Sequence, residues 1–217
     1  MRVLFCSDGF TGARDALIAA IPDHEVVTCH QDDVLAHLDG VDVLIPAMAR
    51  IGADIMDRGS FRLIHQFATG VESIDLHAAK ERGIPVTNIP AKDTGNADAV
   101  AELAILHLLS ILRDLKGADQ VARSGGLGVP VGRSLVDRRV VVFGLGAIGK
   151  EVARRLAGFK VHVTAVGRRP AAEMAEELAE LGVQEYATME DRVEALRGAD
   201  AVIVAVRVTP TSVGIIG

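Results

Sequence analysis

Three glycines connect a short apolar run to a helical pattern within the segment Val140–Leu156. They stand at Gly144, Gly146 and Gly149, in the spacing G-x-G-x-x-G. The spacing alone is weak evidence, but a β-branched strand before it and a helix after it are the context of a dinucleotide-binding turn. There the first glycine makes the bend, the second lets the backbone approach a pyrophosphate, and the third lets helix and strand pack closely. The alternative is a glycine-rich turn that binds nothing.

The residues after the next predicted strand, Val161–Val166, indicate which dinucleotide fits. That strand runs into Gly167, Arg168 and Arg169, and no carboxylate occurs before Glu173. NAD-binding domains usually place an Asp or Glu about twenty residues after the glycine turn, where it bonds the ribose 2′-hydroxyl. Two guanidinium groups instead suit a 2′-phosphate. The sequence therefore favours NADP(H), with NAD(H) as the second choice and a solvated basic turn as the alternative without a ligand.

Short β-like runs alternate with helix-like segments along the chain, a pattern typical of βαβ units with parallel strands. One series fills residues 1–94, and a second, which holds the glycine turn, fills residues 95–217. The predicted fold is α/β, with two doubly wound parallel-sheet domains of which the second is an incomplete Rossmann domain. The predicted strands of the first series are Val3–Cys6, Glu25–Thr28, Val41–Ile45, Leu63–Gln66 and Pro85–Thr87.

A single long helix is predicted over Asp98–Ala122. It is apolar on nearly every face through Leu112, and a helix that is apolar all round must be buried on every side. The apolar residues that cover more than one face are Ala99, Leu103, Ile105, Leu106, Leu109 and Leu112. We therefore expect a homodimer; the alternative is burial of this helix within one chain.

Charge and composition argue against several classes of protein. A net charge of −6, with no Trp and one Tyr, gives neither the electrostatic footprint nor the stacking platforms of a nucleic-acid binder. No apolar run is long enough to cross a membrane, and Asp8 ends the N-terminal apolar run too early for a signal peptide. Cys6 and Cys29 lie in apolar, strand-like stretches. We predict that they are free buried thiols, which fits a cytoplasmic protein.

Five stretches of the sequence carry a more specific signal. They are Thr69–Asp75, Arg82–Asn88, Thr94–Glu102, the glycine turn, and Val208–Gly217. In this order they resemble the D-isomer-specific 2-hydroxyacid dehydrogenase family, and they span most of the chain. The resemblance implies a flavodoxin-like substrate domain over 1–94 and a Rossmann domain over 95–217. It also implies hydride transfer between a nicotinamide cofactor and a small D-2-hydroxy or 2-oxo acid.

The resemblance further implies roles for single residues. The loop that contains Gly70 and Val71 would offer backbone N–H groups to the substrate carboxylate. Position 167 would lie beside the adenosine ribose. The other residues that the match places at the cofactor are Thr69, Val100 and Val206, which would line it, and Ala147 and Ile148, which would cover the pyrophosphate. The long helix would belong to the dimer interface.

This chain differs from the family in its catalytic residues. The family's Arg, Glu and His all lie beyond the segment that matches Val208–Gly217, so we expect no catalytic residue within this chain. The seven histidines are interpreted as structural or surface residues, with His65 the nearest to the Thr69 loop, and no metal site is expected. We therefore predict that the 217 residues, C-terminally truncated relative to the family, do not turn over 2-oxo acids. The alternative function is a non-catalytic dinucleotide-binding module for regulation or interaction.

Overall fold

A computed structural model describes residues 1–90, 94–209 and 212–216 of the chain. Three positions of the Val208–Gly217 stretch (210, 211 and 217) therefore lie outside the described residues. The chain divides into two compact units. Unit 1 comprises Met1–Pro90 and Val208–Val213, and unit 2 comprises Ala91–Arg207 and Gly214–Gly217.

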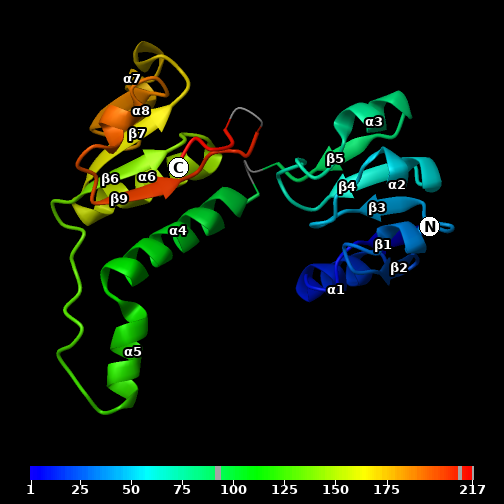
Figure 1. The fold of residues 1–217 in the computed structure, drawn as a ribbon, viewed down its shortest axis with the longest axis horizontal. Helices are drawn as coiled ribbons and strands as arrows, with labels where there is room; N and C mark the ends of the chain where they lie inside the picture. The colour runs from blue at the N-terminus through cyan, green and yellow to red at the C-terminus, as the bar shows by residue number, and fades with distance from the viewer. Residues whose placement is uncertain (91–93, 210–211, 217) are drawn as a thin grey trace. The chain divides into compact units, whose positions relative to one another are not determined.

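Unit 1 is built on a five-stranded parallel sheet (Figure 1). Its strands are β1 (Arg2–Phe5), β2 (Glu25–Thr28), β3 (Val43–Ile45), β4 (Leu63–Gln66) and β5 (Val86–Asn88). They lie in the order β2-β1-β3-β4-β5, which is the flavodoxin-like order. The connecting helices are α1 (Thr11–Ala20), the 3₁₀ turn η1 (Val34–His37), α2 (Ala53–Arg58) and α3 (Leu76–Glu81). The predicted fold class is confirmed.

Apolar side chains are buried on both faces of the unit 1 sheet. Along β1, Leu4 packs into one hydrophobic cluster, while Val3 and Phe5 pack into the cluster on the other face. Strands buried on both faces carry continuous apolar runs, and for this reason a strand such as β1 could be predicted from the sequence. Cys6 and Cys29 are buried and free, as predicted.

Unit 2 holds a four-stranded parallel sheet in the order β8-β7-β6-β9. Its strands are β6 (Arg139–Phe143), β7 (His162–Gly167), β8 (Glu185–Thr188) and β9 (Ala201–Val204). This is the order of the first four strands of a Rossmann sheet. The helices after the glycine turn are α6 (Ala147–Leu156), the 3₁₀ turns η2 (Ala157–Phe159) and η3 (Ala171–Glu173), α7 (Ala175–Glu180) and α8 (Arg192–Leu196). The stretch between β7 and β8 is thus divided between η3 and α7.

The predicted single helix over Asp98–Ala122 is wrong. The structure has two helices, α4 (Asn96–Leu112) and α5 (Leu115–Arg123), and the chain changes direction between them (Figure 1). Asp114 adopts a left-handed backbone conformation with a φ of 44°, and its carboxylate accepts a hydrogen bond from the Gly117 N–H at 3.2 Å. Asp is a good N-cap and a poor interior residue, so it ends one helix and starts the next.

One face of α4 packs into the core of unit 2. Its buried residues are Ala97, Ala101, Ile105 and Leu108, three of which belong to the cluster that also contains α6 side chains. Leu103, Leu106 and Ile111 are exposed, the last to 79%. The helix is therefore apolar on both its packed and its exposed faces. No helix in the described part of the chain has the length and apolar character to cross a bilayer.

Candidate functional site

The turn between β6 and α6 requires glycine at its first position. Gly144 has a φ of +102°, and its N–H donates a hydrogen bond to the Val166 carbonyl oxygen at 2.8 Å. A Cβ at this position would lie 2.7 Å from the carbonyl oxygen of Ala205 and 2.8 Å from Cγ1 of Val206. Both the conformation and the space therefore exclude a side chain, and the turn stays tight against the residues that follow β9.

The other two glycines differ in what surrounds them. Gly149 is buried, and a Cβ there would lie 3.0 Å from the Gly144 carbonyl carbon and closer still to its oxygen. Gly146, the N-cap residue of α6, is exposed and has no atom within 4 Å of where a Cβ would stand. The third glycine thus allows close packing, while the second borders open space. The approach of a pyrophosphate to Gly146 stays a prediction.

The first turn of α6 is electrostatically suited to an anion. Among the described residues, no side chain caps this helix and no acidic residue lies in its first turn. Arg154 and Arg155 lie in its last turn, where they complement the negative end of the helix dipole. Ala147 is exposed and Ile148 is half-buried. Uncapped N–H groups beside open space at Gly146 fit a pyrophosphate, so the residues present fit a dinucleotide.

The residues after β7 form a second part of the site, at the same carboxyl edge of the sheet. Gly167 is buried, while Arg168 and Arg169 are exposed. The Nη2 of Arg169 lies 2.6 Å from Oε2 of Glu177, and Lys150 of α6 pairs with the same carboxylate. These hydrogen bonds, from Lys150 first and then from Arg169, hold the pKa of Glu177 below its ordinary value. In the described part of the chain no carboxylate pairs with Arg168.

Val206 and Val100 also belong to unit 2. Val206 follows β9 and packs against the cluster formed by Val141, Phe143 and Val166, directly beside Gly144. Val100 lies in the second turn of α4 and is 37% exposed. The structure therefore brings Val206 together with the glycine turn at the carboxyl ends of β6 and β9, the edge where ligands bind in open α/β sheets.

The predicted substrate residues lie in unit 1, in the loop that follows β4. The Asn88 side-chain amide donates a hydrogen bond to the Thr69 carbonyl oxygen at 2.6 Å and ties this loop to β5. Val71 packs against the main cluster of unit 1, and its carbonyl oxygen accepts from the Ile74 N–H at 3.0 Å. Gly70 lies between these two anchored residues, so its backbone is held at the carboxyl edge of the sheet.

Two of the histidines, His65 and His162, make local contacts. His65 Nδ1 lies 2.8 Å from the hydroxyl of Thr87 on the neighbouring strand. His162 Nε2 lies 3.1 Å from Oε1 of Glu185. Both contacts join adjacent strands, in keeping with structural roles. Across residues 1–90, 94–209 and 212–216, no group of three or more His, Cys, Asp or Glu side chains could hold a metal ion.

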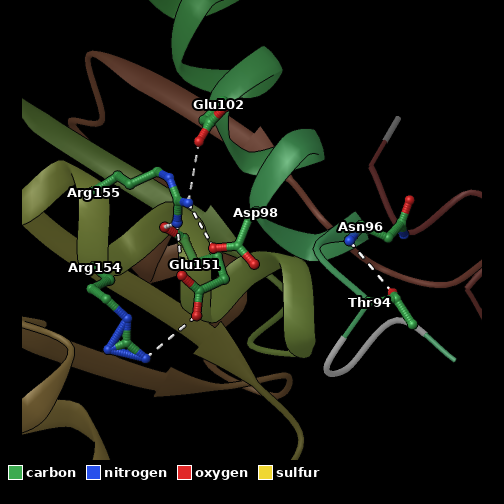
Figure 2. A network of polar contacts seen from close by, with 7 residues as sticks. All are labelled: Thr94, Asn96, Asp98, Glu102, Glu151, Arg154 and Arg155. Carbon is green, nitrogen blue, oxygen red and sulfur yellow. Dashed lines mark hydrogen bonds and ion pairs between the residues drawn. The ribbon is translucent and has the colours of Figure 1, made fainter.

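Sequence reasoning missed an ionic cluster that joins α4 to α6 (Figure 2). Arg155 lies 2.8 Å from Asp98, 3.5 Å from Glu102 and 2.7 Å from Glu151. At the start of α4, the Thr94 hydroxyl accepts a hydrogen bond from the Asn96 N–H at 3.5 Å. The i, i+4 spacing of Glu151 and Arg155 was a readable signal, but the contacts with α4 depend on the tertiary fold.

Comparison with known proteins decides the family. Residues 105–217 match the model of the D-isomer specific 2-hydroxyacid dehydrogenase, NAD binding domain. The chain belongs to this family. The match covers the glycine turn and the segment after β7, so a nicotinamide cofactor is the ligand that the family assigns to unit 2.

Members of the D-isomer-specific 2-hydroxyacid dehydrogenase family with assigned activities are similar to this chain. A glyoxylate reductase from Thermococcus kodakarensis is 33% identical over 189 residues, which cover 81% of this chain and 53% of the relative. A hydroxypyruvate reductase from Thermotoga maritima is 32% identical over 147 residues, which cover 65% of this chain and 47% of the relative. The chain thus spans about half the length of these relatives.

A solved structure has the same fold as this chain. The TT0316 protein from Thermus thermophilus superposes with a TM-score of 0.78 and 29% sequence identity. The superposition covers 98% of this chain and 67% of that structure. Both units of this chain therefore have counterparts in one known protein.

Proposed function

We propose that this chain carries the cofactor-binding and substrate-carboxylate-binding parts of an NAD(P)-dependent D-2-hydroxyacid dehydrogenase. When bound, the nicotinamide supplies or accepts the hydride that interconverts a 2-oxo acid and a 2-hydroxy acid. The observation that carries the proposal is the open space at Gly146 beside the uncapped N-terminus of α6. It lies within the segment that matches the family's NAD-binding domain.

In this proposal unit 2 holds the cofactor. The backbone N–H groups at the start of α6 bind the pyrophosphate, which Ala147 and Ile148 cover. Gly144, Gly146 and Gly149 give the turn its shape. Within unit 2, Val206 and Val100 line the cofactor. The proximity of Val206 to the glycine turn supports this assignment.

Unit 1 holds the substrate carboxylate in this proposal. Backbone N–H groups at Gly70 and Val71 donate to its oxygens, and such charge-assisted bonds are about twice as strong as neutral ones. The support is that Thr69 is tied to Asn88 and Val71 is packed in the core, so the loop is fixed before substrate binds. Small 2-oxo acids such as glyoxylate and hydroxypyruvate are the substrate class, as the names of the relatives suggest.

The proposed cofactor is NADP(H) rather than NAD(H). Position 167 lacks the carboxylate that bonds a ribose 2′-hydroxyl, and Arg168 is an exposed cation that suits a 2′-phosphate. Arg169 can bind the 2′-phosphate as well only if its guanidinium first breaks its ion pair with Glu177. Arg168 therefore carries most of the proposed preference.

The proposed assembly is a homodimer formed through α4. Leu103, Leu106 and Ile111 form an exposed apolar face on this helix, and its opposite face is buried in unit 2. A second copy of the chain would remove these side chains from water, which is favourable by about 25 cal/mol per Å² of apolar surface. Analytical ultracentrifugation tests this assembly, and a stable monomer at micromolar concentration would contradict it.

The experiment that tests the function separates binding from turnover. NADPH fluorescence is titrated with the purified chain, and NADPH absorbance is then followed after glyoxylate or hydroxypyruvate is added. We expect saturable binding without oxidation, because the contacts of His65 and His162 are structural and neither is placed as an acid–base group. Binding without oxidation is also the result that a non-catalytic module would give, so the assay is repeated on any longer form of the protein. Absence of binding would overturn the proposal.

A further inference from the structure

Tyr186 of β8 lies over the end of β7 beside the proposed adenosine ribose site. Pairing of the two strands places Ala165 opposite Tyr186 and Gly167 opposite Thr188. Because side chains alternate across a sheet, Tyr186 lies on the same face as position 167. Its hydroxyl donates a hydrogen bond to the Arg169 carbonyl oxygen at 2.7 Å. The tyrosine therefore spans from its own strand to the backbone of the loop that follows β7.

This ring leaves no room for a side chain at position 167. A Cβ on Gly167 would lie 3.1 Å from both Cζ and Cε2 of Tyr186, and closer still to the hydroxyl oxygen. Gly167 does not adopt a left-handed backbone conformation, so space rather than conformation requires glycine here. Since the hydroxyl is held by Arg169, the ring can move aside only by losing that hydrogen bond.

Glu177 distinguishes the two arginines that follow Gly167. Its carboxylate pairs with Arg169 at 2.6 Å and also with Lys150, so the guanidinium of Arg169 is occupied. Arg168 is exposed and pairs with no carboxylate among the described residues. One arginine is thus used inside the protein and the other remains available to a ligand.

We propose that Tyr186 is a specificity-determining residue that excludes a carboxylate from position 167 and so favours a 2′-phosphorylated dinucleotide bound by Arg168. This inference rests on the proposed function, since it concerns the same cofactor site. Tyr186 contacts the loop rather than the reacting atoms, and it acts by occupying the volume that a ribose-binding Asp or Glu would need. The loop backbone, fixed through the Arg169 carbonyl, holds Arg168 at the ribose.

A double-mutant cycle tests this role by calorimetric titration with NADP⁺ and NAD⁺. The variants are Gly167→Asp, Tyr186→Ala and the two combined. We expect Gly167→Asp alone to lose at least tenfold in NADP⁺ affinity without gaining NAD⁺ affinity, because its carboxylate collides with the ring. The combined variant is expected to bind NAD⁺ at least tenfold more tightly than Gly167→Asp does. Equal NAD⁺ affinity for these two variants would overturn the proposal.

A control and a second readout keep the cycle interpretable. Gly158→Asp introduces the same carboxylate at a position where no atom lies within 4 Å of the added Cβ. This variant should keep the original affinities for NADP⁺ and NAD⁺. If Gly167→Asp does not fold, Gly167→Ala is compared with and without Tyr186→Ala by urea unfolding. If adding Tyr186→Ala restores the urea midpoint that Gly167→Ala lowers, the collision between the two side chains is supported. If the midpoint is not restored, the proposal is overturned. Failure of the unsubstituted chain to bind either dinucleotide would instead reject the proposed function itself.

Discussion

Arg155 of α6 lies with its Nη2 2.8 Å from Oδ1 of Asp98 in the first turn of α4 (Figure 2). The same guanidinium lies 2.7 Å from Glu151 on its own helix. The contact fastens the start of α4, two residues before Val100, to the helix whose N-terminus forms the proposed pyrophosphate site. Two elements of the proposed cofactor site are thus held together by a side chain in the last turn of α6.

Replacing Arg155 with Ala should lower the urea midpoint of unit 2. The substitution leaves Asp98, Glu102 and Glu151 as neighbouring negative charges without their shared cation, and unpaired like charges repel. The matched control is Arg123→Ala, which removes a more exposed arginine that pairs with Asp119 on its own helix, α5. Exposed pairs contribute little, so the control should unfold near the original midpoint. Equal shifts in the two variants would contradict the role of the cluster.

Replacing Gly149 with Ala should destabilise the protein by about 1–3 kcal/mol, the usual cost of forcing an extra methyl into a packed site. The added Cβ would meet the Gly144 carbonyl, which is backbone and cannot turn away. In contrast, Gly158→Ala places its Cβ in open space and should leave stability unchanged or slightly raised. Urea unfolding followed by circular dichroism measures both variants. An unaffected Gly149→Ala protein would show that helix and strand do not pack this closely.

The two cysteines should be unreactive in the folded protein. Burial raises the pKa of the Cys6 and Cys29 thiols, so very little thiolate, the reactive form, exists near neutral pH. We expect a chromogenic disulfide reagent to detect no thiol in the native protein and 2 per chain in concentrated guanidinium chloride. Fast reaction of the native protein would place at least one of them at the surface.

Acid should weaken unit 2 partly through Glu185. Hydrogen bonding, first from His162 and then from Thr164, with Arg139 nearby, lowers the pKa of this carboxylate below its ordinary value of 4.5. A carboxylate whose pKa is depressed by folding stabilises the native state fully above its ordinary pKa, and the contribution is lost as the pH falls through the lower native value. The urea midpoint of Glu185→Gln should therefore fall less steeply than that of the original protein below about pH 4.5. If the urea midpoints of the two proteins fell equally steeply with decreasing pH, this role of Glu185 would be contradicted.

Much of the fold was predictable because the central strands β1 and β6 are buried and carry continuous apolar runs. The predicted segments Glu25–Thr28 and Leu63–Gln66 also match the observed strands residue for residue. The glycine turn was also predictable. Gly144, Gly146 and Gly149 meet local steric demands, and these demands are visible in a short stretch of sequence.

What escaped prediction depends on contacts between distant residues. Strand β8 is a polar edge strand whose Glu185 and Tyr186 give no apolar run. The break at Asp114 follows from a capping preference that the surrounding apolar pattern obscured. The pairing of Arg169 with Glu177 requires α7 to pack beside the loop after β7, which no spacing rule contains.

The most direct test of the proposed NADP(H) site is a calorimetric comparison of NADP⁺ and NAD⁺ binding to the unsubstituted chain and to Arg168→Ala. We predict tighter binding of NADP⁺ and a loss of about 1.5–3 kcal/mol, roughly ten- to hundredfold, when the phosphate contact of Arg168 is removed. Arg197→Ala removes the same charge from an exposed pair with Glu194 and should change neither affinity. Equal affinity of the unsubstituted chain for NADP⁺ and NAD⁺, or an Arg168→Ala variant that still prefers NADP⁺ to the same degree, would contradict the account.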